Sequence, residues 1–327
     1  MMTRDRIAPT APIHSLPRSE TGARTLPKFE ATPRTAWPRR ILVGTDGTSS
    51  SASAIKAAHS LAERTGAAVQ METVYRPRVP VPPSSARRGI DQCERGERGP
   101  AITLLRKVQR QRHELSRYAH GWPLRLEVGD PVAVITGLAK ETASDLVVTG
   151  IGHFDPVGAR CDGRTVLRMA RQLDVALFAV APECESPTRC IVVLPDGRMH
   201  GPTIDAALQC LPPDACVWIA LPDRSIAPDP ELIEQGSARE IALGARPAGL
   251  PADERDRRTY KRVDVTGDML AGVLRLAEDV GAELLAVPNR GEPGPVRVFL
   301  PNLAEPLLVA APCSVLVVPD VTHHGGA

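Results

Sequence analysis

Apolar and polar residues follow two alternating patterns along most of this chain. Short apolar runs, typical of strands that are buried on both faces, are separated by stretches in which apolar residues recur at helical spacing. The first run is RRILVGTD at 39–46, and an alanine-rich helical pattern follows it at 47–66. Thr48 or Ser49 is suited to cap this helix, and Gly66 to end it. The pattern therefore predicts a strand followed by a helix.

The same alternation continues as far as residue 182. Further strands are predicted at 67–75, 123–128, 145–150 and 175–182, and helices at 102–121, 131–144 and 164–173. Asp130 and Pro131 are a typical cap and first residue for the helix that they begin. Residues 76–100 are rich in Pro and Arg and predict a long loop. Strands and helices that alternate in this way predict a parallel, doubly wound α/β sheet.

The second half of the chain repeats the first. The matched segments are 41–46 with 191–196, 129–150 with 266–289, and 175–182 with 313–320. Repeats of this length indicate duplicated domains rather than a solenoid. The middle of the second copy, 223–259, is rich in Pro, Asp and Arg, which predicts that its second helix is shortened.

These patterns divide the chain into two domains and their flanks. We expect a flexible N-terminal extension at 1–38, domain 1 at 39–182, a linker at 183–189, domain 2 at 190–320 and a flexible tail at 321–327.

Composition narrows the functional classes. Aromatic residues make up only 3% of the chain, so the cores must consist of Ala, Val, Leu and Ile, which suits buried parallel strands. The net charge is +2 and the basic residues form no dense stripe, so we expect no nucleic-acid partner. No apolar run approaches the roughly 18 residues of a membrane span. The seven cysteines contain no C-x-x-C pair, which argues against a zinc site and favours a cytoplasmic location.

Candidate chemistry lies where two strands end. Asp46 follows the first strand, and the glycine-bearing loop GIGHFDPVGARCDGRT at 150–165 follows the fourth. The carboxyl ends of adjacent central strands flank the position where doubly wound sheets bind ligands. Asp46 can accept hydrogen bonds from an adenine amino group or a ribose hydroxyl, and the backbone N–H groups of 163–166 can hold phosphate at a helix N-terminus.

This pairing resembles the universal stress protein family in its tandem form, over residues 41–182 and 190–320. Nucleotide-binding members carry an Asp in a T-D turn after the first strand and the loop pattern G-x2-G-x9-G-[S/T/N]. Those positions are filled here by Thr45 and Asp46 in the turn and by Gly150, His153, Gly163 and Arg164 in the loop, with Thr165 beside Arg164. The resemblance implies two tandem Rossmann-like, adenine nucleotide α-hydrolase-like domains, each a five-stranded parallel sheet with helices on both faces.

The resemblance also implies a ligand, which is ATP or another adenine nucleotide in domain 1, with Mg²⁺ only as a companion of the nucleotide. By family position, Thr45 and Val74 line the base pocket and Asp46 contacts the adenosine part. The loop residues that receive ribose and phosphates are Gly150, Gly152, His153, Gly163, Arg164 and Thr165. Family domains pair through their final strands, so we expect an internal pseudo-dimer or a homodimer. We expect no catalytic residues and, at most, weak ATP hydrolysis.

The second copy departs from the family pattern. Asp196 and Gly291 are kept, but Pro288 and Pro301 replace the outer glycines. Because Pro301 has no N–H group to offer a phosphate, we expect no nucleotide in domain 2.

Other interpretations stay open at this point. Asp46 can cap the turn that it begins, and the Arg164 side chain can lie in solvent rather than hold phosphate. The altered loops favour, as an alternative, a nucleotide-free signalling or adaptor module that acts through protein partners. An adenylating enzyme is disfavoured, because the S-G-G-x-D-S loop of such enzymes has no counterpart after the first strand.

Overall fold

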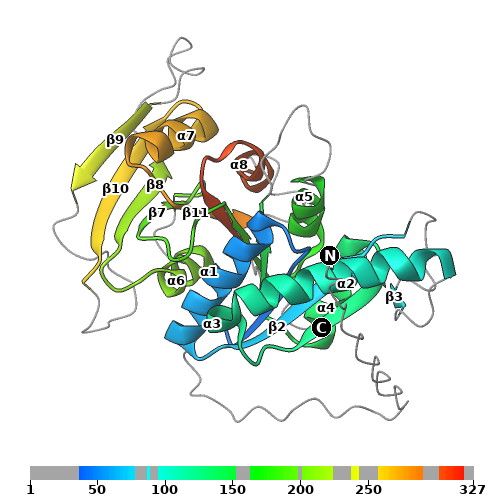
Figure 1. Ribbon diagram of the computed structural model, residues 1–327. Coiled ribbons are helices and arrows are strands. Elements are labelled where there is room, and N and C mark those ends of the chain that lie inside the picture. The colour runs from blue at the N-terminus through cyan, green and yellow to red at the C-terminus, as the bar shows by residue number, and fades with distance from the viewer. Residues whose placement is uncertain are drawn as a thin grey trace, which may run out of the picture. The chain divides into compact units, whose positions relative to one another are not determined.

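Parallel strands with helices packed on both faces make up most of the described chain (Figure 1). The computed structural model describes residues 37–77, 87–88, 95–151, 163–197, 201–223, 237–242, 257–289 and 302–319. These residues belong to one compact unit. Helical spacing and strand alternation in the sequence thus translate into the α/β fold class that they predict, which is confirmed.

The first repeat contains six of the described strands. They are β1 (Arg40–Gly44), β2 (Ala68–Tyr75), β3 (Arg87–Arg88), β4 (Leu124–Gly129), β5 (Leu146–Gly150) and β6 (Ala176–Val180). Its helices are α1 (Ser49–Thr65), α2 (Arg95–Glu114), α3 (Ser116–Ala119), α4 (Pro131–Glu141) and α5 (Gly163–Gln172). The expected end signals act as predicted, since Thr48 caps α1, Gly66 ends it with φ 71° and Asp130 caps α4.

The second repeat follows the same order with fewer described helices. Its strands are β7 (Arg189–Val193), β8 (Cys216–Pro222), β9 (Ser237–Ala242), β10 (Thr259–Thr266), β11 (Leu284–Asn289) and β12 (Ser314–Pro319). Its helices are α6 (Pro202–Cys210), α7 (Met269–Asp279) and α8 (Ala304–Ala310).

All twelve described strands form one sheet in the order β3-β4-β2-β1-β5-β6-β12-β11-β7-β8-β10-β9. Each repeat contributes five strands that pair in parallel, as expected. The short β3 and the longer β9 pair antiparallel to the outer strands β4 and β10. In the centre, the final strands of the two repeats pair antiparallel, with Leu316 opposite Phe178.

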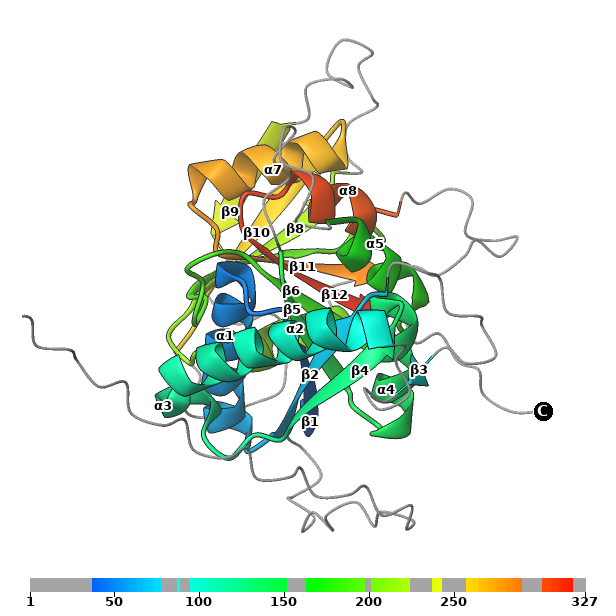
Figure 2. The same cartoon turned by 45° about the vertical axis from the view of Figure 1, so that its right-hand side comes forward.

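Two apolar layers cover the sheet, one on each face. Side chains of α1 and α6 pack on one face with Ile41, and side chains of α4, α5, α7 and α8 pack on the other with Leu42. Each layer contains residues of both repeats, so the core is continuous across the β6–β12 pair. Figure 2 shows α5 and α8 side by side, where Arg171 forms an ion pair with Glu305.

Two predictions of secondary structure were wrong. The helix expected at 102–121 begins at Arg95, inside the predicted 76–100 loop, and ends at Glu114. Gly96, Gly99 and Pro100 are weak helix formers, but the helix accommodates them on an exposed stretch near its start. In the second repeat, the described part of 223–259 holds the strand β9, which pairs with β10, rather than a shortened helix.

The junction of the repeats is a sensitive point for stability. Phe178 is 2% exposed on β6, next to β12. Phe178→Ala should lower the free energy of unfolding by about 3–5 kcal/mol, because it leaves a cavity between the repeats. Val309→Ala on α8 is the control, since Val309 is 49% exposed and its truncation should cost less than about 0.5 kcal/mol. Denaturant titration of the full chain measures both, and similar losses would contradict the expectation.

Candidate functional site

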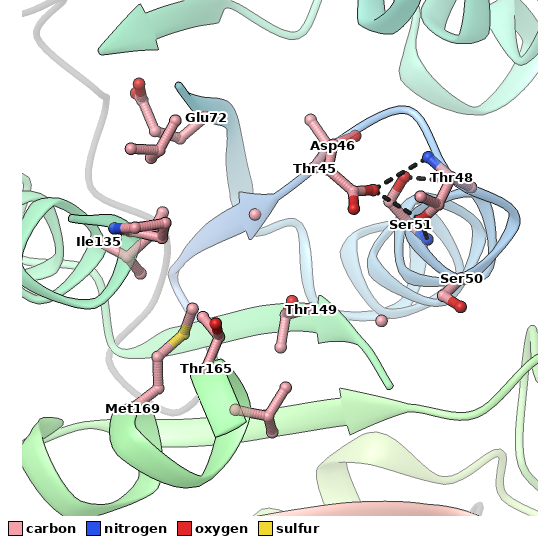
Figure 3. A pocket seen from close by; sticks show the side chains of 15 residues that line it. Thr45, Asp46, Thr48, Ser50, Ser51, Glu72, Ile135, Thr149, Thr165 and Met169 are labelled. Atoms are coloured by element: carbon pink, nitrogen blue, oxygen red, sulfur yellow. Dashed lines mark hydrogen bonds between the residues drawn. The ribbon is translucent and has the colours of Figure 1, made fainter. Parts of the chain in front are cut away.

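A cavity of about 220 Å³ opens at the carboxyl ends of β1, β2 and β5 (Figure 3). The N-terminal parts of α1, α4 and α5 meet around it. The lining residues are Gly44, Thr45, Asp46, Thr48, Ser50, Ser51, Glu72, Val74, Pro131, Ile135, Thr149, Gly150, Thr165, Val166 and Met169. This is the edge of the sheet at which α/β proteins of this type bind ligands.

The cavity brings together five of the residues that the sequence singled out, namely Thr45, Asp46, Val74, Gly150 and Thr165. Gly163 is the first residue of α5. Arg164 is exposed and lies outside the lining, as the solvent interpretation expected. Gly152 and His153 lie outside the described residues.

Asp46 has a role in the turn between β1 and α1. Its Oδ1 accepts hydrogen bonds from the backbone N of Thr48 at 2.9 Å and from Thr48 Oγ1 at 2.6 Å. Among the described residues, none donates a hydrogen bond to its other carboxylate oxygen, and the side chain is exposed at the cavity. Asp46 therefore caps the turn with one oxygen and has the other available for a ligand.

Gly150 is required by the packing of β5 against the first turn of α1. A Cβ atom at this position would overlap the carbonyl group of Ser50 and would lie 2.7 Å from Ser50 Cβ. Any side chain would push α1 away from the end of β5 and widen the cavity. The glycine predicted as a contact for phosphate is thus explained by a close approach between two parts of the protein.

Asp130 joins the two helices that flank the cavity on one face of the sheet. It caps α4 by accepting from the backbone N of Val132 and Ala133, and Arg168 of α5 donates to both of its oxygens at 3.0 and 3.1 Å. Burial raises the pKa of Asp130, but the hydrogen bonds of Arg168 and Ala133 and the charges of Arg168 and Arg76 bring that pKa below its ordinary value. The pair fixes the N-terminus of α4 relative to α5.

A profile described as the universal stress protein family matches residues 38–180 and 220–319 of this chain. The chain belongs to the universal stress protein family. The two matched segments agree with the tandem form that the sequence predicted, and the recognition is confirmed.

Solved structures of family members show the same fold. A universal stress protein from Archaeoglobus fulgidus DSM 4304 is 13% identical, with a TM-score of 0.53, and the alignment covers 86% of this chain and 98% of that one. A putative universal stress protein from Pseudomonas aeruginosa UCBPP-PA14 is 15% identical, with a TM-score of 0.49, 86% of this chain and 93% of that one being covered. A universal stress protein in complex with cAMP is 26% identical over 44% of this chain and 98% of its own, with a TM-score of 0.33. No curated protein matches the chain in sequence.

The second repeat uses the equivalent positions differently. Asp268 caps α7 as Asp130 caps α4. However, Asn289, at the end of β11, donates its side-chain N–H to the carbonyl of Ala170 at 2.5 Å and so contacts α5 of the first repeat. The helix α8 has only seven residues, too few to resemble the ten-residue α5.

Several lining residues were missed from the sequence, among them Ser50, Ser51, Thr149 and Glu72. Glu72 is fully buried on β2, and Figure 3 shows it on the opposite side of the cavity from Thr165. An acidic residue within the apolar run 67–75 is an unusual feature that could have indicated the site. Within the described ranges, no cluster of three His, Cys, Asp or Glu side chains is suited to a metal ion. None of the described helices combines the length and apolarity of a bilayer span.

The role of Gly150 is testable by adding one methyl group. Gly150→Ala should lower the free energy of unfolding by about 1–3 kcal/mol, since the Cβ meets the backbone of Ser50. Gly137→Ala on α4 is a matched control, because no atom lies within 4 Å of its added Cβ. That control should stabilise the protein by about 0.4–1 kcal/mol. Thermal unfolding of both variants decides, and a neutral Gly150→Ala would contradict the packing explanation.

The Asp130–Arg168 pair makes stability depend on pH. Because the folded pKa of Asp130 lies below 3.8, its ionised form stabilises the fold above that pH, and the contribution is lost as the pH falls through the folded pKa. Asp130→Asn keeps a capping oxygen but removes the charge. We expect it to be less stable than the wild type by about 1 kcal/mol at neutral pH, with the difference vanishing near about pH 3. Denaturant titrations at the two pH values test this, and a constant difference would oppose it.

Proposed function

We propose that the first repeat binds an adenine nucleotide, ATP or another, and that the chain acts as a nucleotide-responsive stress protein. The observation that carries the proposal is the cavity at the ends of β1, β2 and β5, where Asp46 faces the first turns of α1 and α5. A carboxylate for hydroxyl or amino donors and helix N-termini for phosphates are the two chemistries that a nucleotide needs.

The distribution of charge in the cavity favours one orientation of the nucleotide. The carboxyl groups of Asp46 and Glu72 belong to the β1 and β2 side, together with Val74. Thr165 and the N-terminus of α5 lie on the other side. We expect the base against Val74, the ribose hydroxyls at Asp46 and the phosphates at the first turn of α5, including the backbone of Gly163, because anionic phosphates are repelled by the carboxylates.

The size of the cavity limits what the described residues enclose. Sites for small molecules usually measure about 300–1,000 Å³. The cavity of about 220 Å³ is smaller, so these residues enclose part of a nucleotide rather than all of it. We expect Mg²⁺ only as the counter-ion that the phosphates bring, and we propose no catalytic residue.

The test is calorimetric titration of ATP, ADP, AMP and cAMP into the full chain. We expect a dissociation constant of about 1–100 μM for at least one of them. Asp46→Asn keeps an acceptor for the turn but removes the charge, and it should weaken binding about tenfold or more. Asp196→Asn, at the equivalent position of the second repeat, is the matched control and should leave binding unchanged.

Absence of heat with all four nucleotides, from a protein that circular dichroism shows to be folded, would overturn the proposal. The alternative, a module that acts through protein partners without nucleotide, would then be the better explanation. Equal effects of Asp46→Asn and Asp196→Asn would place binding somewhere other than this cavity.

A further inference from the structure

A buried glutamine of α2 holds the loop between β1 and α1. Gln111 is 8% exposed. Its Oε1 lies 3.2 Å from Thr45 Oγ1 and 3.1 Å from Ser51 Oγ, both of which can donate to it, and its Nε2 donates to the carbonyl of Thr48 at 2.5 Å. Both ends of one amide therefore bind the segment that carries Asp46.

Lys107, one turn earlier on α2, supports the same loop. Its Nζ donates to the carbonyl of Asp46 at 3.2 Å. Its aliphatic part packs against Gly47, where φ is +73° and an added Cβ would lie 2.9 Å from Lys107 Cγ. Together, Lys107 and Gln111 contact all four residues from Thr45 to Thr48.

The loop is a thin wall between two spaces. Thr45, Asp46 and Thr48 line the candidate nucleotide cavity on one side. Gly47 and Thr48 line, with Lys107 and Gln111, a groove of about 410 Å³ on the other. A wall of this kind keeps its shape only if it is supported from behind, and the described contacts behind it come from α2.

Packing alone does not explain a glutamine here. Burying an amide is costly unless its donor and acceptor are both used, and an apolar side chain of similar length would fill the same space. The amide matches the two hydroxyls and the carbonyl that the loop presents, so its polar groups serve the conformation of the loop.

We propose that Gln111, assisted by Lys107, is a positioning residue of the nucleotide site. It holds the β1–α1 loop so that one oxygen of Asp46 stays engaged with Thr48 while the other faces the cavity. This inference rests on the proposed function, because a ligand benefits from a loop that is fixed before binding.

The experiment compares Gln111→Met with Gln109→Met in the full chain. Methionine keeps the length of the side chain but forms none of the three hydrogen bonds, and Gln109 is an exposed residue of the same helix. We expect Gln111→Met to weaken nucleotide binding about tenfold, which corresponds to about 1.4 kcal/mol, and Gln109→Met to leave it unchanged. Lys107→Met should show a smaller loss. Hydrogen exchange of the amides of residues 45–52, measured without nucleotide, should become faster only in the Gln111 and Lys107 variants.

Gln111→Glu separates positioning from packing. An ionised carboxylate cannot donate to the Thr48 carbonyl, whereas a protonated one can replace the amide N–H. The ratio of its dissociation constant to that of the wild type should therefore fall toward one as the pH is lowered from about 8 to about 5. A residue that only filled space would give a ratio independent of pH.

The outcomes distinguish this inference from the proposed function. If the wild type binds nucleotide but Gln111→Met binds equally well with unchanged exchange, the positioning role is overturned and the proposed function stands. If no nucleotide binds to the folded wild type, the proposed function fails and the positioning role fails with it. The exchange data then show separately whether α2 holds the loop.

Discussion

Parallel strands carry backbone N–H and C=O groups that only neighbouring strands can satisfy, and in this chain both faces of those strands are apolar. Helices cover the faces, but each five-stranded sheet still has two edges. One edge of each repeat is closed by the partner repeat, through β6 and β12, and the other is followed by the antiparallel strands β3 and β9. The order of the whole sheet follows from the need to pair these edges.

The same backbone geometry prepares the candidate site. Parallel strands place all their carboxyl ends along one edge, and the following helices begin there with unsatisfied N–H groups. In the first repeat this edge is hollow, because Gly150 allows α1 to approach β5 while Asp130 and Arg168 hold α4 and α5 apart from it. In the second repeat Asn289 contacts α5 instead.

Local signals in the sequence were sufficient for most of the fold. Hydrophobic runs marked the parallel strands, and Thr48, Gly66 and Asp130 marked the helix ends, because capping depends on adjacent residues. The start of α2 and the strand β9 were missed, since Gly99 and Pro100 oppose a helix locally and β9 is specified by its pairing with β10. Asp46 and Thr165 were found at the cavity through their positions next to strands. Glu72 and Gln111 were not, because their proximity to the loop arises only when β2 and α2 pack against α1.

The pairing of β6 with β12 within one chain has a consequence for how the two halves can evolve. Two separate copies would meet only at sufficient concentration, whereas tethered halves meet at any dilution. Identical copies would also have to carry every substitution on both sides of the symmetry axis. Here Arg171 can acquire its partner Glu305, and Ala170 its partner Asn289, with no matching change elsewhere. One half is thereby free to become a permanent structural companion, while the other retains a binding pocket.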